Sequence, residues 1–135
     1  MRLPHKAHLA IVDGERFVLM INNGSPDEPS LSEVAKPELS GQNYSAGVRH
    51  QDDIGQQKGN TDLDELAHAA AAAEYLNRMA MDGKFERLAI VADPKSLGEM
   101  RRHYHKTLKD VLIEEEAKTV GGESISRIEE KLLAT

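Results

Sequence analysis

The feature that most constrains the fold is an apolar run that passes directly into a helix start. Residues 88–92 are apolar without alternation, which is typical of a strand covered on both faces in an α/β sheet. Asp93 has the side chain to cap a helix, and Pro94 fits the first helical turn, where a missing N–H costs nothing. We therefore predict a central strand at residues 87–92. Its largest side chains are expected to be almost wholly buried: Leu88, Ile90 and Val91.

Composition limits the chain to a few protein classes. With 135 residues, 39% of them hydrophobic, the chain is expected to form one domain over residues 1–135. No apolar run is long enough to cross a bilayer and residues 1–6 lack a signal-peptide core, so a cytoplasmic location is expected. The absence of cysteine excludes disulfides, thiolate catalysis and cysteine-bound zinc. A net charge of −6 disfavours nonspecific polyanion binding, although a local basic patch can oppose it.

The first third of the chain predicts a small β-meander and a long loop. Residues 7–12 and 16–21 are apolar and β-prone, and they flank Asp13-Gly14-Glu15, a hairpin signal. A third, weaker strand is expected at 31–35. From residue 36 to residue 60 the sequence loses its period and gathers Gly, Gln, Asn, Asp and Ser. We expect this loop, 36–60, to be mobile or only partly ordered in isolation.

A long first helix is predicted after this loop. It starts at residue 60 or 61, carries acidic residues in its first turn and ends at Asp82-Gly83. Residues 69–73 are all alanine, so the backbone can lie close to a sheet. The expected buried stripe is Leu63, Leu66, Ala70, Ala73, Leu76 and Ala80.

The last third predicts a second helix, a strand and a short final helix. The second helix is expected to run from residue 94 to about residue 111, since apolar residues recur at three-and-four spacing. A strand at 111–118 follows, and Ser126 with Glu129 forms a capping box for the last helix. The expected buried side chains are Leu97, Met100, Tyr104, Leu108 and Val111 in the second helix, and Ile125, Ile128, Leu132 and Leu133 in the last.

Four segments carry a family resemblance. Residues 11–16 form an Asp-Gly hairpin, 85–92 a central strand, and 125–133 a closing amphipathic segment. The most specific match is Leu97-Gly98-Glu99-Met100-Arg101, which fits a Leu-Gly-x-x-Arg motif. Together these segments resemble the bacterial host-attachment protein family, proteins required for attachment to host cells. That name describes a phenotype, so a cytoplasmic member is expected to influence attachment indirectly.

The resemblance also implies a fold. Host-attachment proteins are distantly similar to the central domain of archaeal and eukaryotic peptide release factors, whose shape is broadly like that of ribonuclease H. The implied architecture is a single α/β domain with a mixed β-sheet and helices packed on it. This agrees with the order of strands and helices predicted above.

The similarity to release factors makes the segment before the first helix a candidate site. The release-factor domain presents a Gly-Gly-Gln tip before a long helix, and this chain has Ile54-Gly55-Gln56 at that place. Isoleucine replaces the first glycine, whose conformational freedom a tip entering the peptidyl-transferase centre requires. The alternative is a solvated polar loop. The binding residues implied by the resemblance are Gly55, Gln56, Gln57 and Lys58.

Catalytic and metal sites have weaker support. Asp13 and Asp93 each follow a strand and would converge if those strands pair in parallel, but a hairpin turn and a helix cap explain them better. His103 and His105 are two residues apart, and the chain has no HExxH-like pair and no Gly-x-Ser-x-Gly elbow. We therefore predict no catalytic residue, no metal and no cofactor.

A basic stripe is predicted on the second helix. Most of its members are three, four, seven or eight residues apart, opposite the apolar face, and they can contact RNA phosphates or an acidic protein. The alternative is the solvated face of an amphipathic helix. The stripe consists of Arg101, Arg102, His105, Lys106 and Lys109.

Two classes of function remain open at this point. In the first, the protein is a binding module without catalysis, whose long loop and basic helix meet RNA, the ribosome or a protein partner. In the second, it is a hydrolase that acts on a nucleic-acid or ester bond through the loop glutamine or clustered carboxylates. Because the sequence contains no coherent catalytic set, the first class is favoured.

Overall fold

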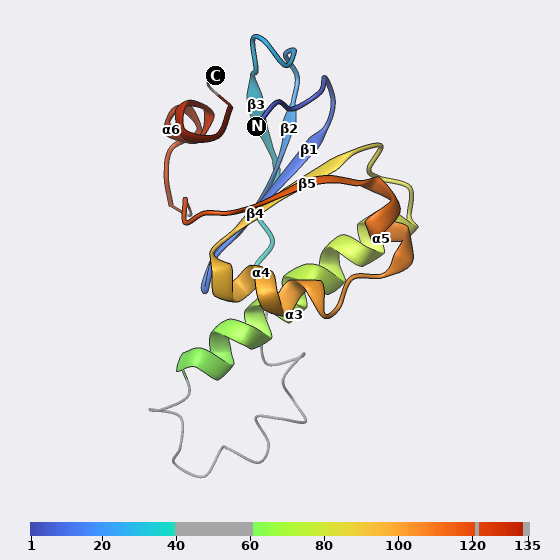
Figure 1. The fold of residues 1–135 in the computed structure, drawn as a ribbon, viewed down its shortest axis with the longest axis vertical. Coiled ribbons are helices and arrows are strands. Elements are labelled where there is room, and N and C mark those ends of the chain that lie inside the picture. Colours follow the sequence, from blue (N-terminus) through green and yellow to red (C-terminus); the bar gives the residue numbers. More distant parts are fainter. Residues whose placement is uncertain (40–60, 121, 134–135) are drawn as a thin grey trace.

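One mixed sheet organises the computed structural model, which describes residues 1–39, 61–120 and 122–133. The strands are β1 (His8–Val12), β2 (Phe17–Asn22), β3 (Leu31–Ala35), β4 (Leu88–Ala92) and β5 (Leu112–Ala117). Their order is β3-β2-β1-β4-β5, with β1, β2 and β3 antiparallel and with β4 parallel to both β1 and β5 (Figure 1). The predicted α/β domain with a mixed sheet is confirmed.

Helices cover both faces of this sheet. Figure 1 shows α3 (Thr61–Met81), α4 (Pro94–Arg101) and α5 (Lys106–Val111) on one face, below the sheet in this view. On the other face lies α6 (Ile125–Ile128), which continues as the π-helix η2 (Glu129–Leu133). Within the described residues, no helix combines the length and apolar character needed to span a membrane.

Strand β4 lies at the centre of two apolar cores. Leu88 and Ile90 pack into the core under α3, α4 and α5, whereas Ala89 and Val91 face the core under α6 and η2. All five strand residues have 0% exposure. An unalternated apolar run is therefore buried on both sides, as predicted.

The alanine-rich middle of α3 brings this helix close to the sheet. Ala69, Ala72 and Ala73 are fully buried, and every residue from 67 to 73 is buried because α3 also packs against α4 and α5. The expected stripe is confirmed from Ala70 onward. Leu63 and Leu66, however, are only half-buried, because the first turns of α3 lie at the sheet edge.

The last helix starts differently from the prediction. Its N-cap is Ser124, whose Oγ accepts the Arg127 N–H at 3.2 Å, so the predicted Ser126–Glu129 capping box is wrong. Glu129 instead accepts the backbone N–H of Leu31 at 2.8 Å, which ties the end of α6 to β3. Ile125 is 38% exposed rather than buried, but Ile128, Leu132 and Leu133 are buried as predicted.

The close contact of α3 with the sheet generates a stability prediction. Ala72→Leu should lower the free energy of unfolding by about 1–3 kcal/mol, because a fully buried alanine site has no room for three more carbon atoms. Arg78→Leu, at an exposed position of the same helix, should change it by less than about 0.5 kcal/mol. Urea unfolding of the three proteins measures both values. A neutral Ala72→Leu would contradict close packing at this position.

Candidate functional site

The carboxyl ends of β1 and β4 lie side by side, at the edge of the sheet where α3 and α4 begin. Val12 pairs with Ala92 in the parallel register, so Asp13 and Asp93 follow at the same edge. Ligands of α/β sheets typically bind outside the carboxyl ends of the strands. An open hollow of about 400 Å³ lies here. We call it the carboxyl-edge site, and its lining is Asp13, Gly14, Glu15, Arg16, Glu65, Asp93 and Thr119.

The two aspartates at this edge have structural partners. Asp13 Oδ1 accepts the backbone N–H groups of Glu15 at 2.8 Å and Arg16 at 2.6 Å, which closes the hairpin turn. Asp93 Oδ2 accepts the Ser96 N–H at 3.1 Å and caps α4. The convergence that parallel pairing permits is thus present, together with the turn and cap roles predicted for each residue. In the described parts of the chain, no three His, Asp or Glu side chains form a group that could hold a metal ion.

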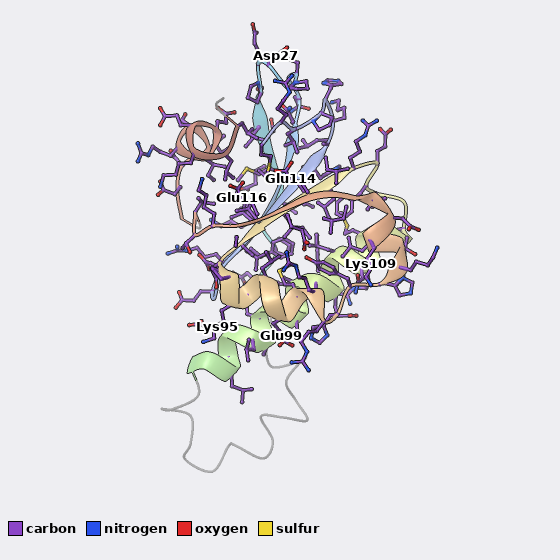
Figure 2. The ribbon with its side chains drawn as sticks, viewed as in Figure 1. Asp27, Lys95, Glu99, Lys109, Glu114 and Glu116 are labelled. Carbon is purple, nitrogen blue, oxygen red and sulfur yellow. The ribbon has the colours of Figure 1, made fainter. Side chains whose placement is uncertain are left out.

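Gly14 allows α3 to approach the hairpin closely. A Cβ at Gly14 would lie 2.8 Å from Glu65 Cγ, so this glycine leaves space for the Glu65 side chain. The Glu65 carboxylate also lies 3.7 Å from Lys95 Nζ of α4 (Figure 2 shows Lys95 beside the first turns of α3). The hairpin, α3 and α4 therefore meet around one carboxylate at the carboxyl-edge site.

His68 is a buried polar group behind this site, and it is not among the residues predicted from the sequence. Burial lowers its pKa, while a hydrogen bond to the Asp13 backbone and the charges of Asp13, Glu15 and Asp93 act in the opposite direction. His68 Nδ1 and Asp93 Oδ1 are both buried without a hydrogen-bond partner among the described residues. The signal in the sequence is a lone histidine directly before five alanines, inside a helix segment that must be buried.

The lowered pKa of His68 predicts a pH dependence of stability. Below the ordinary histidine pKa of 6.5 the unfolded chain takes up a proton that folded His68 resists, so stability should fall as the pH drops from about 7 to about 5. His68→Gln removes this titration and should flatten the fall. Urea unfolding at several pH values tests it. The half-buried His8, whose pKa is also lowered by burial, should leave a residual slope in the variant. Equal slopes for the variant and the parent protein would contradict the assignment.

The single basic helix predicted for residues 94–111 is wrong. Helix α4 ends at Arg101 and α5 begins at Lys106, with His105 in extended geometry as the α5 N-cap. Buried Asn77 of α3 accepts the His105 backbone N–H at 2.9 Å and donates to the His103 carbonyl at 2.8 Å. These contacts satisfy backbone groups at the break. The tertiary contact with α3 therefore outweighs the helical spacing of the apolar residues, which predicted one continuous helix.

The basic residues are also largely paired with carboxylates. Arg101 contacts Glu115 at 3.2 Å, Arg102 contacts Glu99 at 3.7 Å, and Lys106 contacts Asp110 at 3.7 Å. His105 Nδ1 accepts the Thr107 N–H at 3.2 Å as a helix cap. Lys109, labelled in Figure 2, projects from α5. The predicted stripe is therefore a surface of nearly balanced charge, divided between two helices.

The break between α4 and α5 gives a prediction for Asn77. Asn77→Ala should lower the free energy of unfolding by about 1–3 kcal/mol, because it leaves two part-buried backbone groups, the His105 N–H and the His103 carbonyl, without the buried Asn77 amide. Asn23→Ala is the matched control, since Asn23 is exposed and its side chain bonds to Ser32 Oγ near solvent. Thermal and urea unfolding compare the two variants. If both are destabilised by the same small amount, Asn77 does not hold the break.

The candidate residues from the sequence form two groups, one that precedes α3 in the sequence and one around the break that Asn77 contacts. Gly55, Gln56, Gln57 and Lys58 lie outside the described residues, and in the sequence they come directly before α3. The basic residues lie around the break between α4 and α5, which Asn77 contacts. Asn77 is 16 residues beyond Thr61, which corresponds to about 24 Å along α3 at 1.5 Å per residue. The carboxyl-edge site lies near the start of α3, since Glu65 lines it.

Comparison with known families gives a match over most of the chain. Residues 6–132 match the model of bacterial archaeo-eukaryotic release factor family 12. The match supports the release-factor likeness expected from the sequence, but it does not carry the host-attachment name. A comparison with curated proteins found no match.

Proposed function

We propose that this chain, which belongs to bacterial archaeo-eukaryotic release factor family 12, is a non-catalytic module that binds the ribosome. The observation that carries the proposal is the family match over residues 6–132, because release factors act at the ribosome. Of the partners suggested by the sequence, namely RNA, the ribosome or an acidic protein, the family name favours the ribosome. A role in host attachment would then be an indirect effect.

The residues before α3 are the proposed contact. In release factors a Gly-Gly-Gln tip precedes a long helix, and here Ile54-Gly55-Gln56 precedes the 21-residue helix α3. Gly55, Gln56, Gln57 and Lys58 offer amide donors, acceptors and one cation to RNA. Because a β-branched isoleucine disfavours the positive φ angles open to glycine, the proposal includes binding at this place without peptide release.

The surface around α4 and α5 has a secondary part in this proposal. Arg102 and Lys109 have exposed side chains, and phosphates would compete with Glu99 for Arg102. Arg101 is more constrained, because Glu115 also accepts the Tyr104 hydroxyl at 2.6 Å. The Arg102 side chain is 76% exposed, and Glu99 keeps its contact with His103 at 2.7 Å when Arg102 leaves, so exchanging this ion pair for a phosphate contact costs little.

Cosedimentation with bacterial ribosomes tests the proposal. The protein should pellet with ribosomes, and Gln56→Ala with Lys58→Ala should weaken binding by roughly tenfold, because the double variant removes one amide group and one cation from the proposed contact. Arg102→Ala with Lys109→Ala should weaken it less and make the salt dependence shallower by about one for each phosphate that is no longer neutralised. No pelleting at low salt would contradict ribosome binding.

Two controls make the result specific. Arg2→Ala with Arg127→Ala removes two exposed, paired arginines away from α4 and α5 and should leave binding unchanged. A peptidyl-tRNA hydrolysis assay on programmed ribosomes should show no release above background. Release that depends on Gln56 would overturn the non-catalytic part of the proposal and favour the hydrolase alternative.

A further inference from the structure

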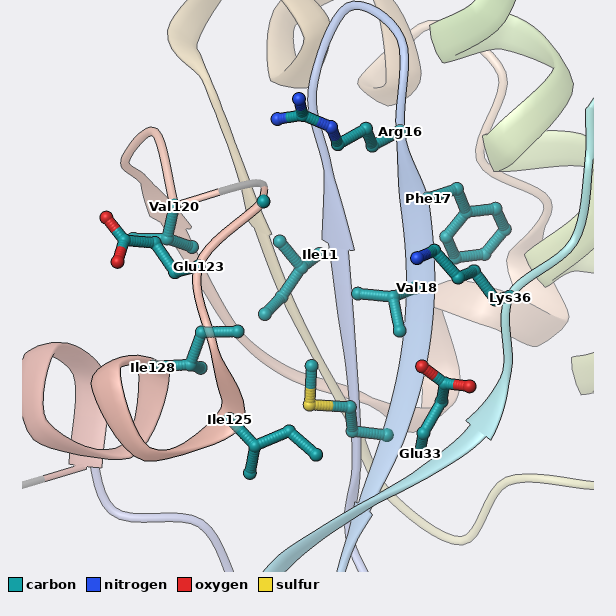
Figure 3. Close-up of a pocket in the computed structure, with 12 residues that line it drawn as sticks. Ile11, Arg16, Phe17, Val18, Glu33, Lys36, Val120, Glu123, Ile125 and Ile128 are labelled. Carbon is teal, nitrogen blue, oxygen red and sulfur yellow. The ribbon is translucent and has the colours of Figure 1, made fainter.

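A crevice separates α6 from the sheet on the face opposite α3. Its volume is about 170 Å³, and Figure 3 shows Ile11 and Val18 on the sheet side and Ile125 and Ile128 on the α6 side. Ile11 and Ile128 are buried, Val18 is half-buried and Ile125 is 38% exposed, so the crevice has an apolar floor with an open mouth. A cavity of about 150 Å³ admits benzene, so this one fits a single ring or a short branched chain.

Two cationic side chains line the crevice. Figure 3 shows the Arg16 guanidinium near the turn between β1 and β2 and the Lys36 amino group lower, next to Phe17 and Val18, with Glu33 below it. Arg16 is held in place by Asp13 Oδ2 at 3.6 Å. Its guanidinium also lies against Gly122, where a Cβ would come within 2.5 Å of Nη1. The side chain of Arg16 is therefore positioned, while 55% of it stays exposed.

The two acidic residues that line the crevice, Glu33 and Glu123, differ in their pairing. Glu123 is paired with Lys131 at 2.8 Å and with Arg127 at 3.7 Å, and these contacts lower its pKa, with Lys131 the larger cause. Glu33 also lines the crevice and has no ion pair among the described residues, so its carboxylate would repel a bound anion. A bound anion should therefore contact Arg16 and Lys36 and avoid Glu33.

We propose that this crevice binds a small monocarboxylate whose body is one ring or a short branched chain. The apolar body lies between Val18 and Ile125, and the carboxylate accepts hydrogen bonds from Arg16 and Lys36. The volume of the crevice limits the size of the ligand, and the two cationic side chains, Arg16 and Lys36, favour a negatively charged group on it. None of the residues that line this crevice is among those proposed to contact the ribosome, so ribosome binding and ligand binding can fail independently.

NMR titration of the ¹⁵N-labelled full chain with phenylacetate tests this site. Saturable shifts should map to residues around Val18, Lys36 and Ile125, with a dissociation constant on the order of 1 mM for so small a ligand. Phenylacetamide has the same shape without the charge, and acetate has the charge without the ring. Both should bind clearly more weakly than phenylacetate.

Charge and shape variants make the test specific. Lys36→Gln and Arg16→Gln should each weaken phenylacetate binding by up to about fivefold, and Glu33→Gln should strengthen it by a similar factor. None of the three should change phenylacetamide binding. Val18→Phe should fill the crevice and abolish binding of both ligands, whereas Lys84→Gln, an exposed control outside the crevice, should change nothing. The amide spectrum of each variant confirms its fold.

Three outcomes would overturn the proposal. The first is equal affinity for phenylacetate and phenylacetamide. The second is a set of shifts confined to residues outside the crevice, or shifts that do not saturate even at phenylacetate concentrations well above the millimolar range. The third is a set of crevice shifts that follow protein concentration instead of phenylacetate, which would identify a second copy of the chain as the occupant.

Discussion

The burial of β4 on both faces is the constraint on which the rest of the structure depends. A strand with five fully buried residues needs apolar cover above and below, and its two neighbours in the sheet run parallel to it. Parallel neighbours require crossover connections, which α3, α4 and α5 supply on one face. The other face is covered by α6 and η2. The same pairing brings the ends of β1 and β4 together, so the carboxyl-edge site follows directly from the burial of β4.

The small side chains of α3 explain why a polar group lies inside this apolar arrangement. Alanines at 69, 72 and 73 bring the helix backbone so close to the sheet that the residue before them, His68, lies within reach of Asp13. A histidine there loses hydration, and its Nδ1 gains no partner among the described residues. Local rules that a fold breaks at one place commonly mark functional sites. His68 therefore lies where the close packing of α3 meets the carboxyl-edge site, which Glu65 and Asp93 line.

Local signals in the sequence predicted the parts of the fold that depend on neighbouring residues. The strand 88–92, the Asp13 turn and the Asp93 cap each need only a few adjacent side chains, and all three are present. The break between α4 and α5 could not be predicted in this way, because Asn77 lies 26 residues before His103. The contact of Glu129 with Leu31 spans 98 residues, so the sequence offered a local capping box as the simpler role. The apolar crevice likewise requires β2 and α6 to be placed together.

The pairing of charges on α4 and α5 limits how the chain can bind RNA. Its net charge is −6, and three of the five residues in the predicted basic stripe already contact carboxylates. A phosphate that binds one of these three residues must first displace its carboxylate, so it gains less than a phosphate at an unpaired cation. Binding driven by general electrostatic attraction would therefore be weak for this chain. Affinity for a ribosome must then come chiefly from uncharged, directional contacts, and the amide-rich residues before α3 are the part of the sequence best suited to provide them.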